Sequence, residues 1–342
     1  MLETIFVLIG TFVGAGFASG KEIFNFFTIY SFNGIISIFI FSIFLFILIY
    51  KCLNIKINLK IQNYNQFIFY LEKKYKFFNH KFFLLIINIF LSSSFYIMIV
   101  ALSSLFSYQF NVEKFITITW CILICFFIFY NKNINFIYII NSILMPILIL
   151  FIIFLCAFNI NLENINFSEL NINLNIFTAI VMGLLYFSYN SLLLIPIIFN
   201  LKTPKKNNNL KISIIFSLII FLIAFLINLL LLSFYNLVYN LELPILYISN
   251  SSFKIFSYLY FFIILSAIFT TMISSGYSFT SNFYIDNFKI KLIVFLLFSF
   301  IFCLFSFSDL INFFYPIFGL IGFIQIFLIL ADKSWKFILK LV

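Results

Sequence analysis

The sequence has 342 residues, of which 65% are hydrophobic and 9% charged, and phenylalanine alone occurs 57 times. This composition excludes a water-soluble globular protein and is typical of a chain with many membrane-spanning helices. The net charge of +10 comes from lysines that fall mostly in short loops, so it does not indicate a nucleic-acid partner. We expect the lipid bilayer to surround most of the chain.

Apolar segments long enough to cross a bilayer recur along the whole sequence. At about 20 residues per span, they predict ten transmembrane helices in a single domain over residues 1–342. The fold class expected is therefore an all-α polytopic membrane protein. The predicted spans are 4–28, 32–50, 82–108, 115–130, 135–157, 175–199, 211–235, 254–279, 291–307 and 310–331.

The first predicted span contains a glycine-rich stretch from Gly10 to Gly20, with four of the nine glycines of the chain. Each glycine disfavours a helix interior by about 1 kcal/mol relative to alanine, so we expect the helix to break at membrane depth. The free backbone groups of such a break must line a cavity inside the protein, as in the binding sites of many secondary transporters. Close packing of small residues against neighbouring helices is the alternative interpretation.

The lysines are distributed unevenly between the two sides of the predicted bundle. With ten spans, 17 of the 20 lysines fall on one side, together with both termini. The positive-inside rule makes that side cytoplasmic. We therefore expect a multi-pass protein of a bacterial cell membrane with both termini in the cytoplasm.

Residues 51–81 form the longest connection on the lysine-rich side. Within it, residues 64–78 carry apolar groups at helical spacing with charged residues between them. This pattern predicts an amphipathic helix that lies under the bilayer in the interface.

An Asn-rich, acidic connection at 158–174 separates two sets of five predicted spans. Because five is odd, the second set begins on the opposite face, which predicts an inverted repeat with halves at about 4–157 and 175–331. The sixth span should then be interrupted as the first is. Its polar cluster, which includes Tyr186, Ser188 and Asn190, and its Pro196 agree with that expectation. A hydrogen bond from Asn190 to another helix is the alternative.

The eighth predicted span adds four hydroxyl groups within six residues, Thr270, Thr271, Ser274 and Ser275. Such hydroxyls can bond back to their own helix, which is the simplest interpretation for any one of them. Their number favours a polar site.

The segment from Val13 to Ile23, VGAGFASGKEI, resembles the opening motif of the bacterial YkvI-like membrane proteins. More widely, the chain is similar to the amino acid–polyamine–organocation superfamily. The resemblance implies the LeuT fold, a five-plus-five inverted repeat in which helices 1 and 6 are interrupted. It implies no enzyme activity and no cofactor besides a possible Na⁺.

The neurotransmitter:sodium symporter branch has a comparable first-helix pattern, G-N-x-V-G-x-G, and an A-x-x-T-[ST] stretch in its eighth helix. The resemblance implies a sodium site built from three carbonyl groups and two hydroxyls. Its ligands here are Gly10, Val13, Ala267, Thr270 and Thr271. Phe17 replaces the asparagine that serves a second sodium in that branch, so we expect one coupling ion.

The same resemblance places a substrate at the break in the first helix, with its carboxylate at the N-terminus of the outer half-helix. The residues implied to bind substrate are Gly14, Ala15, Gly16, Phe17, Ser19, Tyr186, Ser188 and Asn190. Lys21 or Glu22 is expected to pair with Asp309 as an outer gate. Simple interfacial charges at helix ends are the alternative.

These features favour a secondary active transporter for an amino acid or related small solute, coupled to Na⁺ or H⁺. The alternative is a transporter-like sensor that binds a solute without moving it. The sequence has no phosphate-binding loop for ATP and no hydrolase motif. We expect the solute and the bilayer as partners, without an obligate protein partner.

Overall fold

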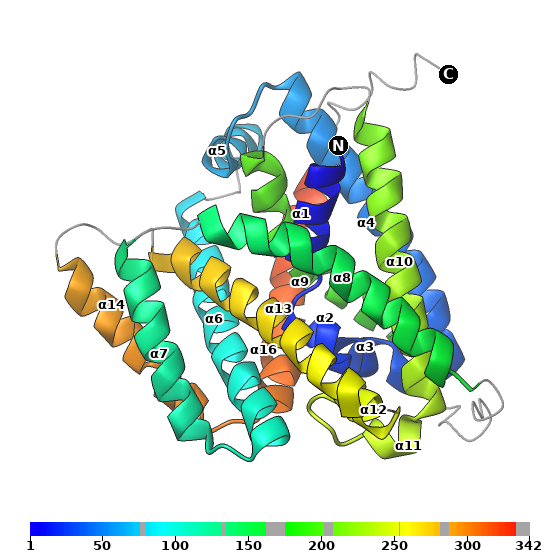
Figure 1. Cartoon of the computed structure of the whole chain (residues 1–342). Coiled ribbons are helices and arrows are strands. Elements are labelled where there is room, and N and C mark those ends of the chain that lie inside the picture. Colours follow the sequence, from blue (N-terminus) through cyan, green and yellow to red (C-terminus); the bar gives the residue numbers. More distant parts are fainter. Residues whose placement is uncertain are drawn as a thin grey trace.

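The structure is a computed structural model that describes residues 1–75, 80–131, 135–161, 175–201, 208–252, 254–280 and 287–332. Every regular element in these ranges is a helix (Figure 1). By length and composition, six helical segments of the described residues can cross a membrane. They are Lys21–Asn58, Lys81–Phe110, Ile176–Asn200, Asn209–Ser233, Ser257–Thr280 and Phe307–Ala331. The chain is therefore a polytopic helical membrane protein, and the count of ten spans stays a prediction.

The helices of the first half follow one another with short connections. They are α1 (Leu2–Phe12), α2 (Ala15–Ser19), α3 (Lys21–Phe26), the 3₁₀ turn η1 (Thr28–Tyr30), α4 (Ser31–Asn58), α5 (Tyr64–Lys74), α6 (His80–Phe110), α7 (Lys114–Asn131) and α8 (Asn135–Asn159). The predicted repeat boundary at 158–174 falls almost wholly outside the described residues.

The second half has two long helices before a short bent connection. Its helices are α9 (Ile176–Asn200), α10 (Asn209–Ser233), α11 (Tyr235–Val238), α12 (Pro244–Ser252), α13 (Lys254–Thr280), α14 (Phe288–Leu297), α15 (Ser299–Phe302) and α16 (Phe307–Ala331). The predicted span 291–307 is divided between α14 and α15, so it is not one continuous helix.

The first predicted span breaks twice within the glycine-rich stretch. Helix α1 ends at Phe12, and the Gly14 N–H bonds to the Phe12 carbonyl instead of the Gly10 carbonyl. Helix α2 then lasts only five residues. Gly20 adopts a left-handed conformation, with φ of 83°, that a side chain would strain. The glycine content thus predicted the position of the break.

The sixth predicted span is not interrupted, so that part of the prediction is wrong. Helix α9 runs from Ile176 to Asn200 and contains Pro196. Two of its polar groups are satisfied within the helix, since the Asn190 amide donates to the Tyr186 carbonyl at 3.0 Å and the Ser191 hydroxyl donates to the Ser188 carbonyl at 2.6 Å. A single glycine and one proline near the end do not outweigh packing against helices on both sides.

Helix α9 lies at the centre of the bundle, packed against α4 and α16. The close approach to α16 depends on Gly322, because a Cβ there would clash with the Ser188 carbonyl. Helix α1 packs against α8, α9 and α10, and α13 packs against α6. Helix α5 and the start of α1 lie at one end of the bundle, called the α5 end here, and α11 and α12 lie at the opposite α12 end (Figure 1).

Helix α5 forms within the predicted amphipathic segment, but it does not lie on lipid through its apolar face. Phe67, Ile68 and Leu71 are buried, and the Phe67 ring stacks on Phe199 of α9 with centroids 4.0 Å apart. The apolar face therefore covers the protein, and the position of α5 under the bilayer stays a prediction. Residues 76–78 of that prediction lie outside the described residues.

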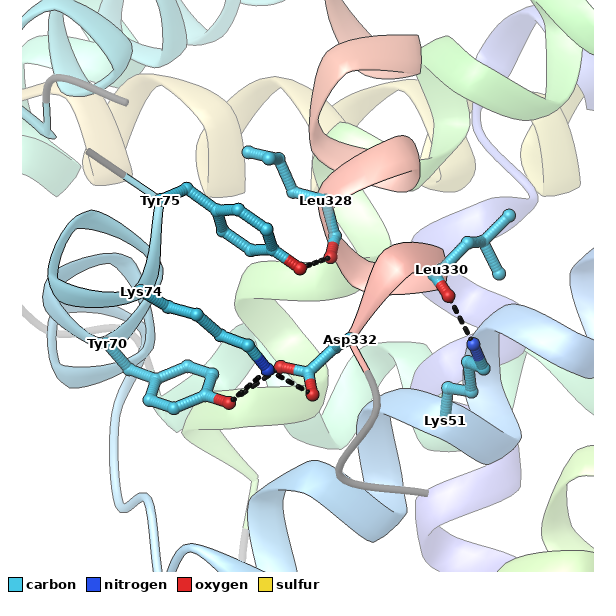
Figure 2. Close-up of polar contacts among 7 residues, drawn as sticks. All are labelled: Lys51, Tyr70, Lys74, Tyr75, Leu328, Leu330 and Asp332. Carbon is cyan, nitrogen blue, oxygen red and sulfur yellow. Dashed lines mark hydrogen bonds and ion pairs between the residues drawn. The ribbon is translucent and has the colours of Figure 1, made fainter. Parts of the chain in front are cut away.

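Polar contacts tie α4 and α5 to the last turn of α16 (Figure 2). The Lys74 ammonium lies 2.6 Å from the Asp332 carboxylate, to which the Tyr70 hydroxyl also donates at 2.7 Å. The Tyr75 hydroxyl donates to the Leu328 carbonyl at 3.1 Å. Lys51 of α4 donates to the Leu330 carbonyl at 2.7 Å, as a cation does at a helix C-terminus. We call these contacts the α5 latch.

Candidate functional site

The most unusual group near the break is the carboxylate of Glu22, which is 3% exposed although it carries an ionisable side chain. It folds back over α2, so that a Cβ on Gly16 would clash with Oε1 of Glu22. The Tyr186 hydroxyl donates to Oε2 at 3.1 Å. No lysine among the described residues lies within 4.0 Å of this carboxylate. Glu22 is thus a buried carboxyl group set into the broken helix.

Two more tyrosines complete the surroundings of this carboxylate. The hydroxyls of Tyr189 and Tyr315 also lie close enough to interact with it. The two rings stack with centroids 4.3 Å apart, and Tyr189 meets Tyr186 edge-on at 5.3 Å. The Tyr189 hydroxyl is buried and makes no hydrogen bond of acceptable geometry in the structure. We call Glu22, Tyr186, Tyr189 and Tyr315 the Glu22 site.

A pocket of about 680 Å³ opens at the α12 end, next to the Glu22 site. It is lined by both charged and amide side chains, among them Lys21, Asn25, Glu242, Asp309 and Asn312. Phe26 is also part of its wall. The Phe26 ring packs against Tyr186 at 5.3 Å and against Tyr189 at 6.2 Å. One phenylalanine therefore lies between the pocket and the tyrosines around Glu22.

The predicted outer gate of Lys21 or Glu22 with Asp309 is not formed as an ion pair in the described residues. Lys21 and Asp309 both line the pocket, and the Lys21 ammonium lies 5.6 Å from the Phe24 ring centroid. Asp309 caps its own helix, since its N–H donates to the Ser306 hydroxyl at 3.1 Å and its carboxylate accepts from that hydroxyl at 2.6 Å. Glu22 is buried beside Gly16 instead, because only a glycine leaves room for it there.

The residues of the predicted sodium site come together only in part. Thr271 of α13 faces the break, about 4 Å from where a Cβ on Gly14 would lie. The Gly10 carbonyl loses its usual helical donor, as described above. The hydroxyls of Thr270 and Thr271 both donate to the Ala267 carbonyl, at 3.2 and 2.8 Å. Each hydroxyl keeps acceptor lone pairs, so sodium binding, including the carbonyl of Val13, stays a prediction.

The predicted substrate residues divide into two groups. Gly14, Gly16 and Tyr186 border the break or the buried carboxylate. The remaining five are buried. Ser19 donates to the Gly16 carbonyl at 3.0 Å and accepts from the Lys21 N–H at 3.3 Å, which braces the bend at Gly20.

The other four residues of that set are also buried. Phe17 packs its ring on Phe12 with centroids 6.0 Å apart, and Ala15 is buried beside it in α2. Asn190 bonds to its own helix. The Ser188 hydroxyl is buried without a hydrogen-bond partner in the structure.

Tyr189, Tyr315 and Phe26 were not predicted as site residues. Tyr186 and Tyr189 are three apart and so share one face of α9, which was a usable signal. Aromatic residues make up 23% of the chain, however, so that no single ring stands out in the sequence. Only the three-dimensional contacts distinguish these from the other aromatic residues: Tyr189 and Tyr315 approach Glu22, and Phe26 packs on Tyr186 and Tyr189.

Comparison with known proteins gives no close relative. No family model matches the chain, and no curated protein matches it. The similar solved structures include the manganese transporter of Eremococcus coleocola. A histidine-to-alanine mutant of that transporter aligns with a TM-score of 0.45 and 14% identity, over 98% of this chain and 71% of that chain. The complex of that transporter with an aromatic bis-isothiourea substituted compound aligns with a TM-score of 0.43 and 14% identity, again over 98% of this chain and 71% of that chain. These TM-scores are below 0.5, so the likeness assigns no function to this chain.

Proposed function

We propose that this protein is a secondary active transporter that moves an amino acid or related small solute across a bacterial cell membrane, coupled to Na⁺ or H⁺. The observation that supports this most strongly is the Glu22 carboxylate, buried beside a break in a membrane helix. An ionisable side chain at membrane depth is costly and is usually retained for function. A broken helix at the same place provides backbone groups for a ligand.

The two ends of the bundle support an alternating-access mechanism. A pocket opens at the α12 end above Phe26, while the α5 latch holds α4, α5 and α16 together at the opposite end. This arrangement suits a state that receives solute from the α12 side. Release on the other side requires the latch to open and the pocket to close.

The orientation and the helix count complete the proposal. We assign the α5 end to the cytoplasm because the predicted topology places most lysines on that side. In this topology the chain has ten spans arranged as two inverted halves of five. Solute then enters from outside the cell.

Two groups are candidates for the coupling ion. The carbonyls of Gly10, Val13 and Ala267 with the hydroxyls of Thr270 and Thr271 form a neutral oxygen set for Na⁺. Glu22 is the candidate for H⁺, since a carboxylate can carry a proton through the cycle. Uptake driven separately by a Na⁺ gradient and by a pH gradient distinguishes them.

Counterflow tests the proposal as a whole. Proteoliposomes loaded with an unlabelled mixture of the common amino acids are diluted into the same mixture carrying a radiolabel. Transient accumulation above protein-free liposomes is the expected result. Saturable binding of these solutes without any counterflow contradicts transport and favours a solute sensor.

A further inference from the structure

We propose that a second, smaller pocket at the α12 end binds a small organic monocarboxylate through Lys114, and that this ligand acts as a modulator. The pocket has a volume of about 290 Å³. Its walls come from the end of α6, the first residue of α7 and the connection between α11 and α12. We call it the Lys114 pocket. It is separate from the Glu22 site, and binding there does not depend on transport.

The first argument is the position of the Lys114 ammonium group. Lys114 is the first residue of α7, a helix of 18 residues. The positive end of the helix dipole lies there, so a cation at this position is disfavoured unless an anion balances it. No carboxylate in the described part of the chain lies within 4.0 Å of this ammonium. A carboxylate bound in the pocket provides the missing negative charge.

The second argument is a buried hydroxyl group on the α6 wall of the pocket. Ser104 lines the pocket and is only 5% exposed, and its hydroxyl has no hydrogen-bond partner in the structure. Its neighbour Ser103 instead donates to the Val100 carbonyl at 2.7 Å, as hydroxyls in helices commonly do. Ser107, one turn further along α6, also lines the pocket. An unpaired buried hydroxyl is costly, and a carboxylate oxygen can accept from both serines.

The third argument is the apolar part of the wall, which favours an organic anion over a halide ion. Leu241 and Leu243 line the pocket beside its polar groups. A ligand whose carboxylate meets Lys114 can place a short hydrocarbon chain against these leucines, which removes apolar surface from water. Small-molecule sites usually combine such apolar walls with a few polar groups that fix the orientation of the ligand. A halide ion has no apolar part to contact the leucines.

Glu242 limits the ligand to a single negative charge and connects the two pockets. It lines the Lys114 pocket and also the larger pocket, where it attracts the Lys21 ammonium. It forms no ion pair within 4.0 Å with either lysine, all three residues being described. A carboxylate bound at Lys114 competes with Glu242 for this lysine and repels it towards Lys21. Occupation of the Lys114 pocket therefore changes the charges at the mouth of the larger pocket, which makes the ligand a modulator.

Three compounds with a four-carbon chain test this inference in the purified full-length protein. Butyrate carries a carboxylate, butylamine carries an ammonium group, and 4-aminobutyrate carries both. Binding is followed by calorimetry and by the thermal stability of the protein, which a ligand of the folded state raises. We expect butyrate to bind saturably, 4-aminobutyrate more weakly, and butylamine not to bind at this pocket. Sodium chloride at the same concentration should not displace butyrate.

Variants show whether butyrate binds in the Lys114 pocket. Lys114→Gln removes the charge and should weaken butyrate binding about tenfold or more, and Ser104→Ala should weaken it about threefold. Glu242→Gln removes the competing carboxylate, so it should tighten binding. Lys211→Gln is the matched control with unchanged binding, since Lys211 is also in the first turn of a helix, α10, and is exposed outside the pocket. Gel filtration confirms that each variant is folded.

The outcomes separate this inference from the transport proposal. Absence of saturable butyrate binding overturns the site, as does unchanged butyrate binding in a folded Lys114→Gln protein. Tighter binding of 4-aminobutyrate than of butyrate overturns it in favour of a site for zwitterions, and weaker butyrate binding in Glu242→Gln overturns the competition. Butyrate binding that depends on Lys114, without counterflow of any amino acid, supports the site and contradicts transport only.

Discussion

Gly16 and Glu22 share one small volume at the break of the first membrane helix. The carboxylate oxygen Oε1 of Glu22 lies where a side chain on residue 16 would begin. The two residues are six apart in the sequence, and the bend at Gly20 returns the chain so that they touch. The glycine is therefore needed for the position of the carboxylate as well as for the break itself.

Gly16→Ala should displace the Glu22 carboxylate. The added methyl overlaps atoms of Glu22, and relieving such an overlap in a packed interior costs about 1–3 kcal/mol of stability. We expect a lowered melting temperature of the purified protein. Gly14→Ala is the matched comparison, since the nearest atom to its Cβ is 3.9 Å away. Equal effects of the two substitutions on the melting temperature contradict the relationship.

Tyr186→Phe should isolate the hydrogen bond to Glu22. The ring keeps its contacts with Phe12 and Phe41, while the donor to the carboxylate is lost. Hydrogen bonds to charged groups contribute about 1.5–3 kcal/mol, so ligand affinity should fall about tenfold or more. Tyr96→Phe removes a buried hydroxyl that donates to the Phe295 carbonyl. It should lower stability without changing affinity, and a similar loss of affinity in both variants refutes the role of Tyr186.

Asp332→Asn should loosen the α5 latch. The Lys74 side chain is 31% exposed, so its ion pair with Asp332 contributes about 1 kcal/mol. Loss of that energy should raise the population of molecules with an open latch about fivefold. The Cys52 thiol is buried near Tyr64 of α5 and reports on this opening. Maleimide modification of Cys52, read by mass spectrometry, should rise severalfold. The buried thiols of Cys121 and Cys125 are internal controls, and unchanged modification of Cys52 contradicts the latch.

The pH dependence of the latch follows from the pKa of Lys74. Burial lowers the pKa of Lys74, but hydrogen bonds to Asp332 and Tyr70 outweigh burial and raise it above its ordinary value. A raised pKa stabilises the folded state below the ordinary pKa of lysine, and this is lost as the pH rises through the folded value. The stability difference between wild type and Lys74→Met should be constant from about pH 7 to 9 and shrink above about pH 10.4. Thermal unfolding of both proteins across this pH range measures the stability difference. A difference that grows with pH contradicts the role given to Lys74.

Thr270→Ala combined with Thr271→Ala should abolish any stimulation of uptake by Na⁺. The two substitutions remove both hydroxyls of the predicted sodium site. Ser274→Ala is the control, because that hydroxyl is exposed and donates to the Thr271 carbonyl at 3.0 Å. Full sodium stimulation in the double variant rejects this site, because Na⁺ must then bind elsewhere in the protein.

The sequence predicted the helical membrane fold and the break in the first span, because composition and glycine content act locally. It did not predict that α9 is continuous. That outcome depends on Asn190 and Ser191 bonding within their own helix and on α4 and α16 packing on either side. The sequence could not reveal which of these opposing tendencies would prevail.

The position of Glu22 shows a different limit. Next to Lys21 and near the end of the span, Glu22 looked like a gate residue at the membrane surface. The second bend, at Gly20, turns α3 so that Glu22 faces Gly16 and Tyr186 while Lys21 faces the pocket. A left-handed residue between two short helices changes the direction of the chain. Helical periodicity alone does not predict where the side chains after such a bend will point. Tyr315 comes from the last helix, and only the folded structure brings it to the site.

Counterflow into proteoliposomes that contain either wild-type protein or Glu22→Gln tests the central claim most directly. The vesicles are loaded with an unlabelled mixture of the common amino acids, and the same mixture is supplied outside with a radiolabel. We predict transient accumulation with the wild type and accumulation at the level of protein-free liposomes with Glu22→Gln. No accumulation with the folded wild type, or equal accumulation with both proteins, contradicts a transporter built around Glu22.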